Sequence, residues 1–242
     1  MTETREEKTA YLVKIFAEEE RPVPEGAAES LADFYALLEE KNRVMNLTAI
    51  RDFEEAAVRH FADSLALVKA VQIPEGAALI DVGSGAGFPG IPLAVCRADV
   101  SVTTLDSTGK KIRFQAEAAE SLGLVNLTPV AARAEELAQK EGYREAFDVC
   151  ASRAVAALPV LAEYCLPFVK RGGYFAAYKA GGADEELKEA GKAIRILGGQ
   201  IEKVCRFRLS DTERMIIIIR KTGKTPAGYP RKNGIPAKKP IR

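Results

Sequence analysis

The sequence predicts an α/β fold built on a mainly parallel sheet. In residues 77–96, a short apolar run is followed by Asp81, by glycines at 83, 85, 87 and 90, and by a second apolar segment. A strand, a glycine-rich turn and a helix in this order form the ligand-binding end of a parallel α/β sheet. After residue 100, short β-branched runs alternate with segments of helical periodicity. This alternation predicts repeated βα units.

Residues 1–75 are expected to form a helical extension. Apolar side chains recur at helix spacing at positions 31, 34, 35 and 38, and again at 58, 61, 65 and 68. The only histidine of the chain, His60, precedes Asp63 and Ser64. No glycine elbow surrounds the serine, so a packing or substrate-positioning role for His60 is favoured over a nucleophilic triad.

Residues 76–220 are expected to form the sheet domain, which begins after the break at residues 74–76. Runs rich in apolar and β-branched residues predict strands at 77–80, 100–105, 127–131, 147–151, 174–178, 204–209 and 215–219. Helical spacing predicts helices at 91–96, 110–122, 156–168 and 187–197. The last two strands are separated only by a short turn.

Residues 221–242 form a basic tail without periodicity. Residues 220–242 carry eight bases and no acid, whereas residues 1–60 carry 14 acids and 8 bases, so the net charge of +1 conceals an asymmetry. A tail of this kind is an electrostatic handle for polyanions. A solvated tail that only keeps the chain soluble is the alternative interpretation.

Composition argues against several classes of protein. No run of 18 apolar residues predicts a membrane span, and the charged N-terminus lacks the apolar core of a signal peptide. The four cysteines, at 96, 150, 165 and 205, are far apart and form no Cys-x-x-Cys pair. We therefore expect buried, inert thiols, no bound metal and a cytoplasmic location.

The spacing of the glycines narrows the choice of ligand. In a dinucleotide fingerprint the third glycine follows the second by three residues, whereas here glycines 83, 85 and 87 alternate. No Lys-Ser or Lys-Thr follows, which disfavours a phosphate-cradling loop. The pattern Asp-x-Gly-x-Gly-x-Gly resembles motif I of the S-adenosylmethionine-dependent methyltransferases. A glycine loop that merely turns the chain is the alternative.

Asp106 ends the next predicted strand, 25 residues after Asp81. A carboxylate there can accept hydrogen bonds from ribose hydroxyls, which suits NAD and S-adenosylmethionine equally. It could instead, or in addition, be the N-cap of the helix that begins near Gly109.

Over nearly its whole length the chain resembles the RsmG (GidB) family, the bacterial 16S rRNA guanine-N7 methyltransferases. The resemblance rests on the segments NLTAI (46–50), HFADS (60–64), DVGSGAGFPGIPL (81–93), LDS (105–107), SRA (152–154) and YPRKNG (229–234). It implies a Rossmann-like class I methyltransferase sheet of seven strands, with the last strand antiparallel, after an N-terminal helical extension. It also implies the cofactor S-adenosyl-L-methionine, with 16S rRNA or the small ribosomal subunit as partner, and we expect a monomer.

The resemblance implies a cofactor site made of Gly83, Gly85, Gly87, Phe88, Asp106, Ser107, Ala134, Glu135 and Arg153. The glycines let the methionine end lie on backbone, and Phe88 walls the pocket. Asp106 and Ser107 hold the ribose side, and the Ala134–Glu135 pair reads adenine edges.

Arg153 has two possible functional partners, the methionine carboxylate and a substrate phosphate. The alternative to a functional role is a surface ion pair. Substrate contacts are expected from Asn46, His60, Arg133, Lys179, Arg231 and Lys232.

The expected reaction is methylation of guanine N7, which has a free lone pair and needs no general base. An exocyclic amine is disfavoured, because SRAV (152–155) stands where an Asn/Asp-Pro-Pro-aromatic motif would be. Methylation of a pyrimidine C5 needs a nucleophilic cysteine, and Cys150 is expected to face the core. Three alternatives remain: a small-molecule or protein methyltransferase, a non-catalytic rRNA-binding or assembly factor, and, more distantly, a nicotinamide oxidoreductase.

Overall fold

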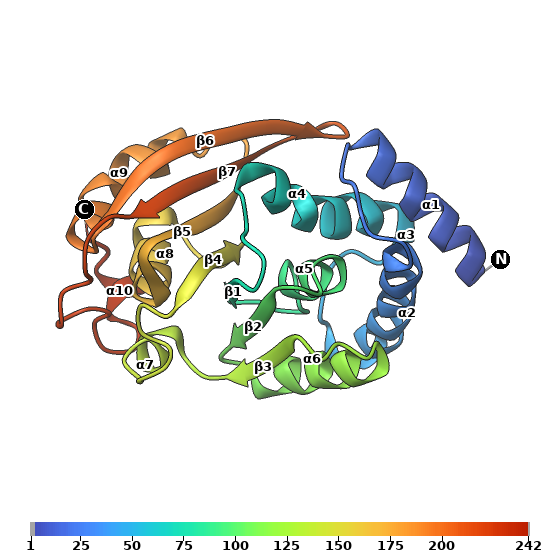
Figure 1. Ribbon diagram of the computed structural model, residues 1–242, viewed down its shortest axis with the longest axis horizontal. Helices are drawn as coiled ribbons and strands as arrows, with labels where there is room; N and C mark the ends of the chain where they lie inside the picture. Colours follow the sequence, from blue (N-terminus) through green and yellow to red (C-terminus); the bar gives the residue numbers. More distant parts are fainter. Residues whose placement is uncertain (1–2, 242) are drawn as a thin grey trace.

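A seven-stranded sheet runs through the middle of the molecule (Figure 1) in the structure, a computed structural model that describes residues 3–241. The strand order is β3-β2-β1-β4-β5-β7-β6, and β7 is antiparallel to both of its neighbours. This confirms the predicted seven-stranded sheet with an antiparallel last strand. The strands are β1 (Ala78–Val82), β2 (Ser101–Asp106), β3 (Leu127–Ala131), β4 (Phe147–Arg153), β5 (Val169–Ala180), β6 (Gly199–Leu209) and β7 (Thr212–Lys221).

Helices cover both faces of the sheet, because its central strands are apolar on both sides. On one face lie α1 (Arg5–Glu18), α2 (Ala27–Met45), α3 (Phe53–Ala56), η1 (Ala57–Ala62), α4 (Asp63–Ala70), α5 (Gly90–Cys96) and α6 (Gly109–Ser121). On the other lie α7 (Ala134–Leu137), α8 (Leu158–Cys165), η2 (Leu166–Phe168) and α9 (Asp184–Ile196). Leu79 of β1 faces the first core and its neighbour Ile80 faces the second, as strand alternation requires.

Four phenylalanines join the N-terminal helices to the sheet domain. Phe34 of α2 packs against Phe61, Phe88 and Phe114, with ring centroids 6.2, 5.4 and 6.2 Å away. Phe61 belongs to η1, Phe88 to the glycine loop and Phe114 to α6. Residues 3–75 therefore share one hydrophobic core with the sheet.

Several element boundaries differ from the sequence prediction. β1 continues through Asp81 to Val82, so this acid lies inside the strand. β5 begins at Val169, five residues before the strand predicted at 174–178, and so includes Gly172 and Gly173. Gly173 lies so close to the Asp148 carbonyl that a Cβ would be 2.5 Å from that oxygen. Glycine here serves close strand packing instead of a loop. Cys205 is half-buried, not buried as expected.

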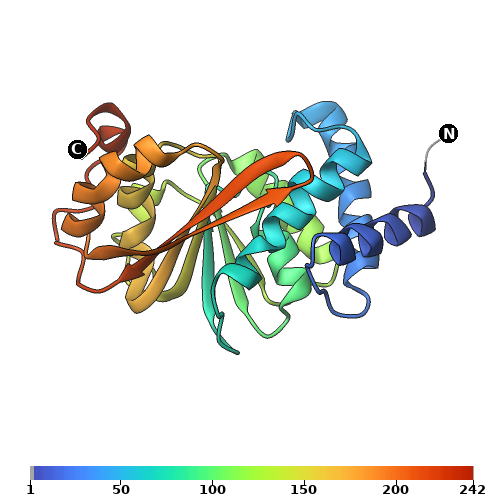
Figure 2. The ribbon, with the colours of Figure 1, turned by 90° about the horizontal axis from the view of Figure 1, so that it is seen from above.

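The β6–β7 hairpin extends beyond the rest of the sheet toward the N-terminal helices (Figure 2). At its tip, Ser210 N donates a hydrogen bond of 3.1 Å to the Glu19 carboxylate at the end of α1. Nearer the sheet, Arg214 of β7 reaches Asp63 at the start of α4, with its Nη2 2.6 Å from Oδ2. The hairpin is therefore anchored to the end of α1 at its tip and to the start of α4 nearer the sheet.

The tail is docked against the body of the protein. It lies beside α7 and α8, at the end of the molecule far from the N-terminus (Figure 1), and contains α10 (Ile235–Lys238). Lys221, the last residue of β7, is 1% exposed, with Nζ 3.1 Å from Glu145. Arg231 forms a 2.5 Å ion pair with Glu163. Two of the eight basic side chains of residues 220–242 thus hold the fold together. Arg242 lies outside the described residues.

We expect Arg231→Met to destabilise the protein by about 2–3 kcal/mol, and to lower Tm by roughly 4–12 °C. The reason is that the Glu163 side chain is 1% exposed and would lose its counter-ion, while the 27% exposure of Arg231 keeps the loss below that of a fully buried pair. Differential scanning calorimetry measures this effect. The double variant Glu163→Gln/Arg231→Met should recover most of the loss, and the neighbouring Lys232→Met should change little. Equal Tm values for Arg231→Met and Lys232→Met would contradict the assignment.

Candidate active site

The glycine loop after β1 is held against β2 by backbone hydrogen bonds. The N–H groups of Gly83 and Ser84 both donate to the Leu105 carbonyl, at 2.7 and 3.0 Å. Gln115 of α6 is fully buried, and its amide donates to Ser84 Oγ at 2.8 Å and to the Gly85 carbonyl at 2.9 Å. The loop is therefore a fixed surface, and Gln115 is a support that the sequence pattern did not reveal.

Close approach requires glycine at two positions of this segment. Gly83 has φ +77°, and a Cβ there would lie 2.3 Å from a methyl group of Val155. At Gly90, the first residue of α5, a Cβ would lie 2.4 Å from the Thr104 side chain. Gly90 N donates to Asp81 Oδ2 at 2.9 Å. Asp81 is fully buried, which raises its pKa to about 7, and it fastens the start of α5.

Asp106 connects the ends of β1 and β2. Its Oδ2 accepts from Gly85 N at 3.0 Å and its Oδ1 from Thr108 N at 2.8 Å. Thr108, not Asp106, is the N-cap residue of α6, so the alternative N-cap role is wrong. Each carboxylate oxygen keeps a free lone pair. Asp106 lines a cleft of about 430 Å³ at the carboxyl ends of the strands, together with Ser107, Arg133, Ala134 and Glu135. We call it the strand-end cleft.

The docked tail completes one wall of the strand-end cleft. Glu135 is 6% exposed, and its Oε1 accepts a 3.0 Å hydrogen bond from Gly234 N. Asn233 donates to Glu136, the next residue of α7, and Ala237 of α10 lines the cleft. The tail therefore lines the cleft through Gly234 and Ala237, which the sequence analysis did not single out.

A second cavity, of about 400 Å³, opens on the other side of the glycine loop. Its lining contains four cationic side chains and no carboxylate: Arg59, Lys111, Arg153 and Arg214. Leu47, Thr48, His60 and Phe88 also contribute. We call it the basic cavity. Its charge suits an anionic ligand.

His60 is held as a neutral ring in the basic cavity. It stacks on Phe88, with centroids 4.4 Å apart and planes at 19°. Its Nδ1 lies 3.4 Å from Arg153 Nη2 and its Nε2 lies 2.8 Å from Thr48 Oγ1. An arginine can only donate, so Nδ1 accepts and Nε2 carries the proton. Burial, reinforced by the Arg153 charge, lowers the pKa of His60 to about 3.

Asp63 sets the position of Arg153. Arg153 Nη1 donates to Asp63 Oδ2 at 2.9 Å and to the Arg59 carbonyl at 2.8 Å. Arg214 makes two further hydrogen bonds to the same carboxylate, at 3.0 and 2.6 Å. Asp63 is 1% exposed. Arg153 is therefore fixed between this ion cluster and the face of Phe88, 5.4 Å from the ring centre.

The two cavities meet at three residues, Gly83, Lys111 and Ala154, which line both. Ala154 has φ +57°, a left-handed conformation that is uncommon outside glycine and is typical of functional sites. Lys111 has one ion-pair partner among residues 3–241, Asp106, with Nζ 3.8 Å from Oδ2. Its ammonium thus stands at the passage between the cavities.

The structure gathers most, but not all, of the residues singled out from the sequence. Gly83, Gly85, Phe88, Asp106, Ser107, Ala134, Glu135, Arg153, His60 and Arg133 line the two cavities. Gly87 instead packs on Ile91. Asn46 is exposed at the end of α2, and Lys179 is engaged by Glu186 and the Ala156 carbonyl, at 2.6 and 2.8 Å. Arg231 pairs with Glu163, and Lys232 lies on the tail beyond Glu135.

Sequence reasoning missed the residues that only the fold brings to the site. Arg59, Lys111 and Arg214 come from three separate segments. Asn42, four residues before Asn46, is buried and makes two 2.9 Å hydrogen bonds to the backbone of Thr48. The segment η1 is a π-helix, and such turns are frequent at functional sites. No motif in the sequence signals it.

Comparison with known proteins identifies the family. The model of the family described as "GidB: rRNA small subunit methyltransferase G" matches residues 27–216. The chain belongs to this family. It is 49% identical over 215 residues to "Ribosomal RNA small subunit methyltransferase G" of Lachnoclostridium phytofermentans, covering 88% of this chain and 89% of that one. The protein of the same name from Desulforamulus reducens is 45% identical over 235 residues, covering 96% and 98%.

Solved structures agree in fold with this GidB-family chain. The [4+2]-cyclase SpnF has a TM-score of 0.56 at 16% identity, covering 83% of this chain and 98% of that one. M. jannaschii TYW2, in complex with AdoMet, has a TM-score of 0.50 at 15% identity, covering 66% and 76%. The sheet is the Rossmann-like class I methyltransferase sheet. Since a cyclase shares this fold, the assignment of activity depends on the family and the site.

None of the helices in the described chain is long and apolar enough to cross a membrane. Within residues 3–241, no group of three or more His, Cys, Asp or Glu side chains is placed to hold a metal ion.

We expect His60 to make the GidB-family fold less stable as pH falls. Its folded pKa of about 3 lies below the ordinary 6.5, so between these values the unfolded chain binds more protons. Stability should fall by up to about 1.4 kcal/mol per pH unit below 6.5. In urea unfolding, the free energy of unfolding of wild type minus that of His60→Gln should fall by about 1.4 kcal/mol between pH 7.5 and 5.5.

The comparison between the two proteins isolates His60, because it is the only histidine. Asp81, whose raised pKa of about 7 acts with the opposite sign over this range, contributes equally to both proteins. Identical pH dependence of wild type and variant would show that His60 is not held neutral.

Proposed function

We propose that this chain transfers a methyl group from S-adenosyl-L-methionine to N7 of a guanine in 16S rRNA. Membership of the GidB family supports methylation of small-subunit rRNA. The finer assignment, to guanine N7, is our inference. We further propose that the protein acts as a cytoplasmic monomer on 16S rRNA or on the small ribosomal subunit.

The observation that carries the proposal is the junction between the two cavities. The strand-end cleft has the position and size of a cofactor site in an open α/β sheet. The basic cavity offers four cations and an aromatic wall, which suits a base on a phosphate backbone. Both are lined by Gly83, Lys111 and Ala154, so a donor in one and an acceptor in the other would meet there.

The residues of the strand-end cleft fit S-adenosyl-L-methionine. Asp106 and Ser107 would hold the ribose, Ala134 and Glu135 the adenine, and Gly83, together with Gly85 from the adjoining basic cavity, the methionine end, as the family resemblance implies. When bound, the cofactor supplies a methyl group that is already activated by its sulfonium. The protein therefore has to supply mainly proximity and alignment.

Neutral His60 agrees with this chemistry, because guanine N7 carries no proton to remove. The ring cannot act as a base toward its neighbours, since Nε2 bears the proton and Nδ1 faces the Arg153 guanidinium. Its stacking on Phe88 and its bond to Thr48 make it part of the cavity wall.

Lys111 is well placed to select guanine. The Hoogsteen edge of guanine presents two acceptors, N7 and O6, whereas adenine has an amino group in place of O6. Methylation needs the N7 lone pair free, so a protein donor must take O6. The other cations of the basic cavity are held in closer ion pairs, Arg59 with Glu55 and both Arg153 and Arg214 with Asp63, at 2.5–2.9 Å, whereas Lys111 Nζ is 3.8 Å from Asp106. The Lys111 ammonium, at the passage between the cavities, can reorient toward O6.

We expect Asp106→Asn to weaken S-adenosyl-L-methionine binding at least about tenfold, because ribose hydroxyls lose a charged acceptor. Asparagine keeps one acceptor oxygen for the glycine loop, so the fold should persist. Isothermal titration calorimetry gives the affinity. Asp99→Asn is the matched control, because that carboxylate lies before the start of β2 and pairs with Arg97. Equal affinity of the two variants would remove Asp106 from the cofactor site.

The function itself is tested by mapping N7-methylguanine in 16S rRNA by primer extension after chemical cleavage, with and without the protein. We expect one new modified guanine. Lys111→Met should lose at least about tenfold in single-turnover rate, with S-adenosyl-L-methionine affinity nearly unchanged. Stoichiometric RNA binding without any modified guanine would favour an assembly factor. Methyl transfer only to small molecules or proteins would favour the other alternative class.

A further inference from the structure

Arg21 is a buried cation without an anionic partner. Its side chain is 7% exposed, and its Nε has no hydrogen-bond partner. Among residues 3–241 it forms no ion pair within 4.0 Å, and its guanidinium carbon lies 5.2 Å from the ring centre of Phe207. The carboxylates of Glu19, Glu20 and Asp63 act on it only from a longer distance. Buried charges in folded proteins are normally paired, so an unpaired one points to a missing ligand.

The end of α1 fixes Arg21 in this position. Glu20 adopts φ +51°, a left-handed conformation that usually needs glycine, and ends the helix. The next residue, Arg21, donates its backbone N–H to the Phe16 carbonyl at 2.6 Å. The turn is therefore closed by the helix itself, and the Arg21 side chain is directed away from α1.

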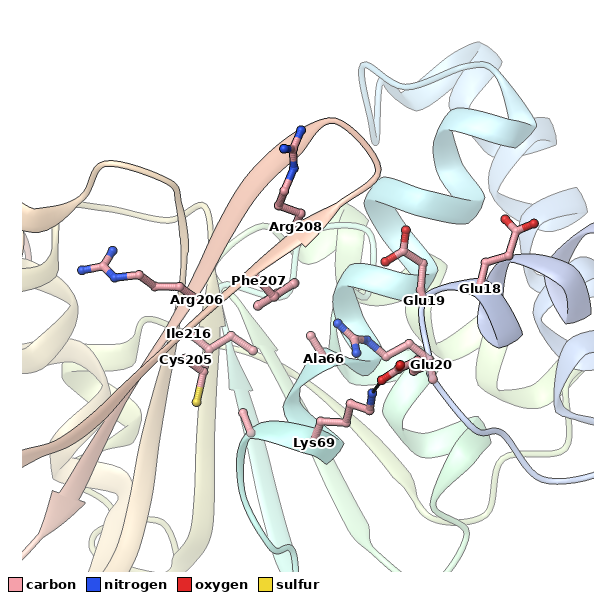
Figure 3. Close-up of a pocket in the computed structure, with 12 residues that line it drawn as sticks. Glu18, Glu19, Glu20, Ala66, Lys69, Cys205, Arg206, Phe207, Arg208 and Ile216 are labelled. Carbon is pink, nitrogen blue, oxygen red and sulfur yellow. Dashed lines mark hydrogen bonds and ion pairs between the residues drawn. The ribbon is translucent and has the colours of Figure 1, made fainter.

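Arg21 lines a cavity of about 370 Å³, which we call the Arg21 cavity. Figure 3 shows that Cys205 and Phe207 enter it from β6, and that Ala66 and Lys69 border it from α4. The end of α1 forms the third side. This cavity shares no lining residue with the basic cavity or the strand-end cleft.

The acids around the Arg21 cavity are already engaged. Glu20 pairs with Lys69 at 2.6 Å, and Glu19 accepts the 3.1 Å hydrogen bond from Ser210 N. Glu18 lies 3.8 Å from Lys14. None of these three carboxylates forms an ion pair with Arg21.

Two of the four cations that line the cavity are free of carboxylates. Lys69 pairs with Glu20, and Arg206 pairs with Asp184 at 2.6 Å. Arg21 has no ion pair, and Arg208 has neither an ion pair nor a hydrogen bond from its side chain within residues 3–241. Arg208 points toward the tip of the hairpin (Figure 3). Arg21 thus marks the inside of the site and Arg208 its outer edge.

The Arg21 cavity lies on the same face of the hairpin as the basic cavity. Phe207 is the cross-strand partner of Arg214, which lines the basic cavity and binds Asp63. The continuous helical segment η1–α4 also runs from one cavity to the other, from His60 to Ala66 and Lys69. Six to nine residues of helix span about 9–14 Å. At 3.4 Å of axis per stacked nucleotide, this corresponds to roughly three or four nucleotides.

We propose that the Arg21 cavity binds a backbone phosphate of the RNA strand whose guanine enters the basic cavity. The guanidinium donates hydrogen bonds to the phosphate oxygens, and Arg208 approaches the same strand from the rim. The bound phosphate is roughly three or four nucleotides from the methylated guanine. This inference rests on the proposed rRNA substrate, and it adds a second anchoring point that fixes the direction of the strand.

The test uses the full-length protein and a synthetic small-subunit rRNA fragment that contains the modified guanine. Arg21→Met keeps the length of the side chain and removes the charge. We expect its affinity, measured by fluorescence anisotropy, to fall about tenfold, and its log–log salt slope to flatten by roughly 0.7. Lys188→Met is the matched control, because this exposed lysine lies on α9 outside all three cavities and is paired with Glu185, and it should change neither quantity much.

A phosphate scan makes the assignment specific. Single methylphosphonate linkages, which are neutral, are placed at each of six positions on either side of the guanine. At one or two positions, roughly three or four nucleotides away, the substitution should weaken wild-type binding about tenfold but leave Arg21→Met binding unchanged. Additive losses at every position would overturn the proposal.

Two further outcomes would also overturn it. If Arg21→Met lowers Tm and leaves the RNA salt slope unchanged, Arg21 is a structural contact of Phe207. If naked RNA binds the variant normally, and only intact small subunits bind it more weakly, the cavity accepts a protein carboxylate. Because binding is measured without methyl transfer, a failure of the proposed activity would be seen separately, in the map of N7-methylguanine.

Discussion

The buried carboxylate of Asp63 organises the functional face of this protein. It receives hydrogen bonds from Arg153 at the end of β4 and from Arg214 of β7, so one side chain joins α4 to two strands that are distant in sequence. An isolated carboxylate at 1% exposure would be strongly unfavourable, and either arginine alone would leave oxygen lone pairs unsatisfied. The three residues therefore require one another, and the positions of both arginines follow from this pairing.

The cofactor side depends on a different constraint, the satisfaction of backbone groups at the strand ends. Asp106 accepts a hydrogen bond from the Gly85 N–H, and Gln115 donates one to the Gly85 carbonyl. The glycine loop therefore presents a fixed surface to the cleft. The tail then closes one wall of the strand-end cleft through Gly234 and Glu135. Residues from both ends of the sheet domain and from the tail thus form one site, and tail residues that look like a solvated extension serve its wall.

The two cavities differ in the charge of the side chains that line them. The strand-end cleft carries Asp106 and Glu135, acceptors suited to hydroxyl and amino groups, beside the cations Lys111 and Arg133, whereas the charged side chains of the basic cavity are all cationic. Lys111 belongs to both linings and lies within 3.8 Å of Asp106. In the proposed function, the cleft for the donor therefore differs from the cavity for the nucleic acid in offering carboxylates, and the glycine loop separates the two. This arrangement suits a transfer reaction that needs alignment more than acid–base chemistry.

Local pattern was sufficient for the main elements of the fold and for the glycine loop at the end of β1. The strand, the glycines at 83, 85 and 87 and Asp106 lie close in sequence, and short-range sterics and hydrogen bonding decide their structure. The basic cavity could not be predicted in this way. Arg59, Lys111 and Arg214 meet only because η1, α6 and the β6–β7 hairpin pack together. The position of a charged residue in the sequence does not reveal which distant residues it will lie beside. Likewise, the sequence shows that Arg231 is basic, but not which acid it pairs with. Only the docking of the tail against α8 brings it to Glu163. The physical reason is that a buried carboxylate requires a counter-ion, and the folded chain supplies one from a distant segment.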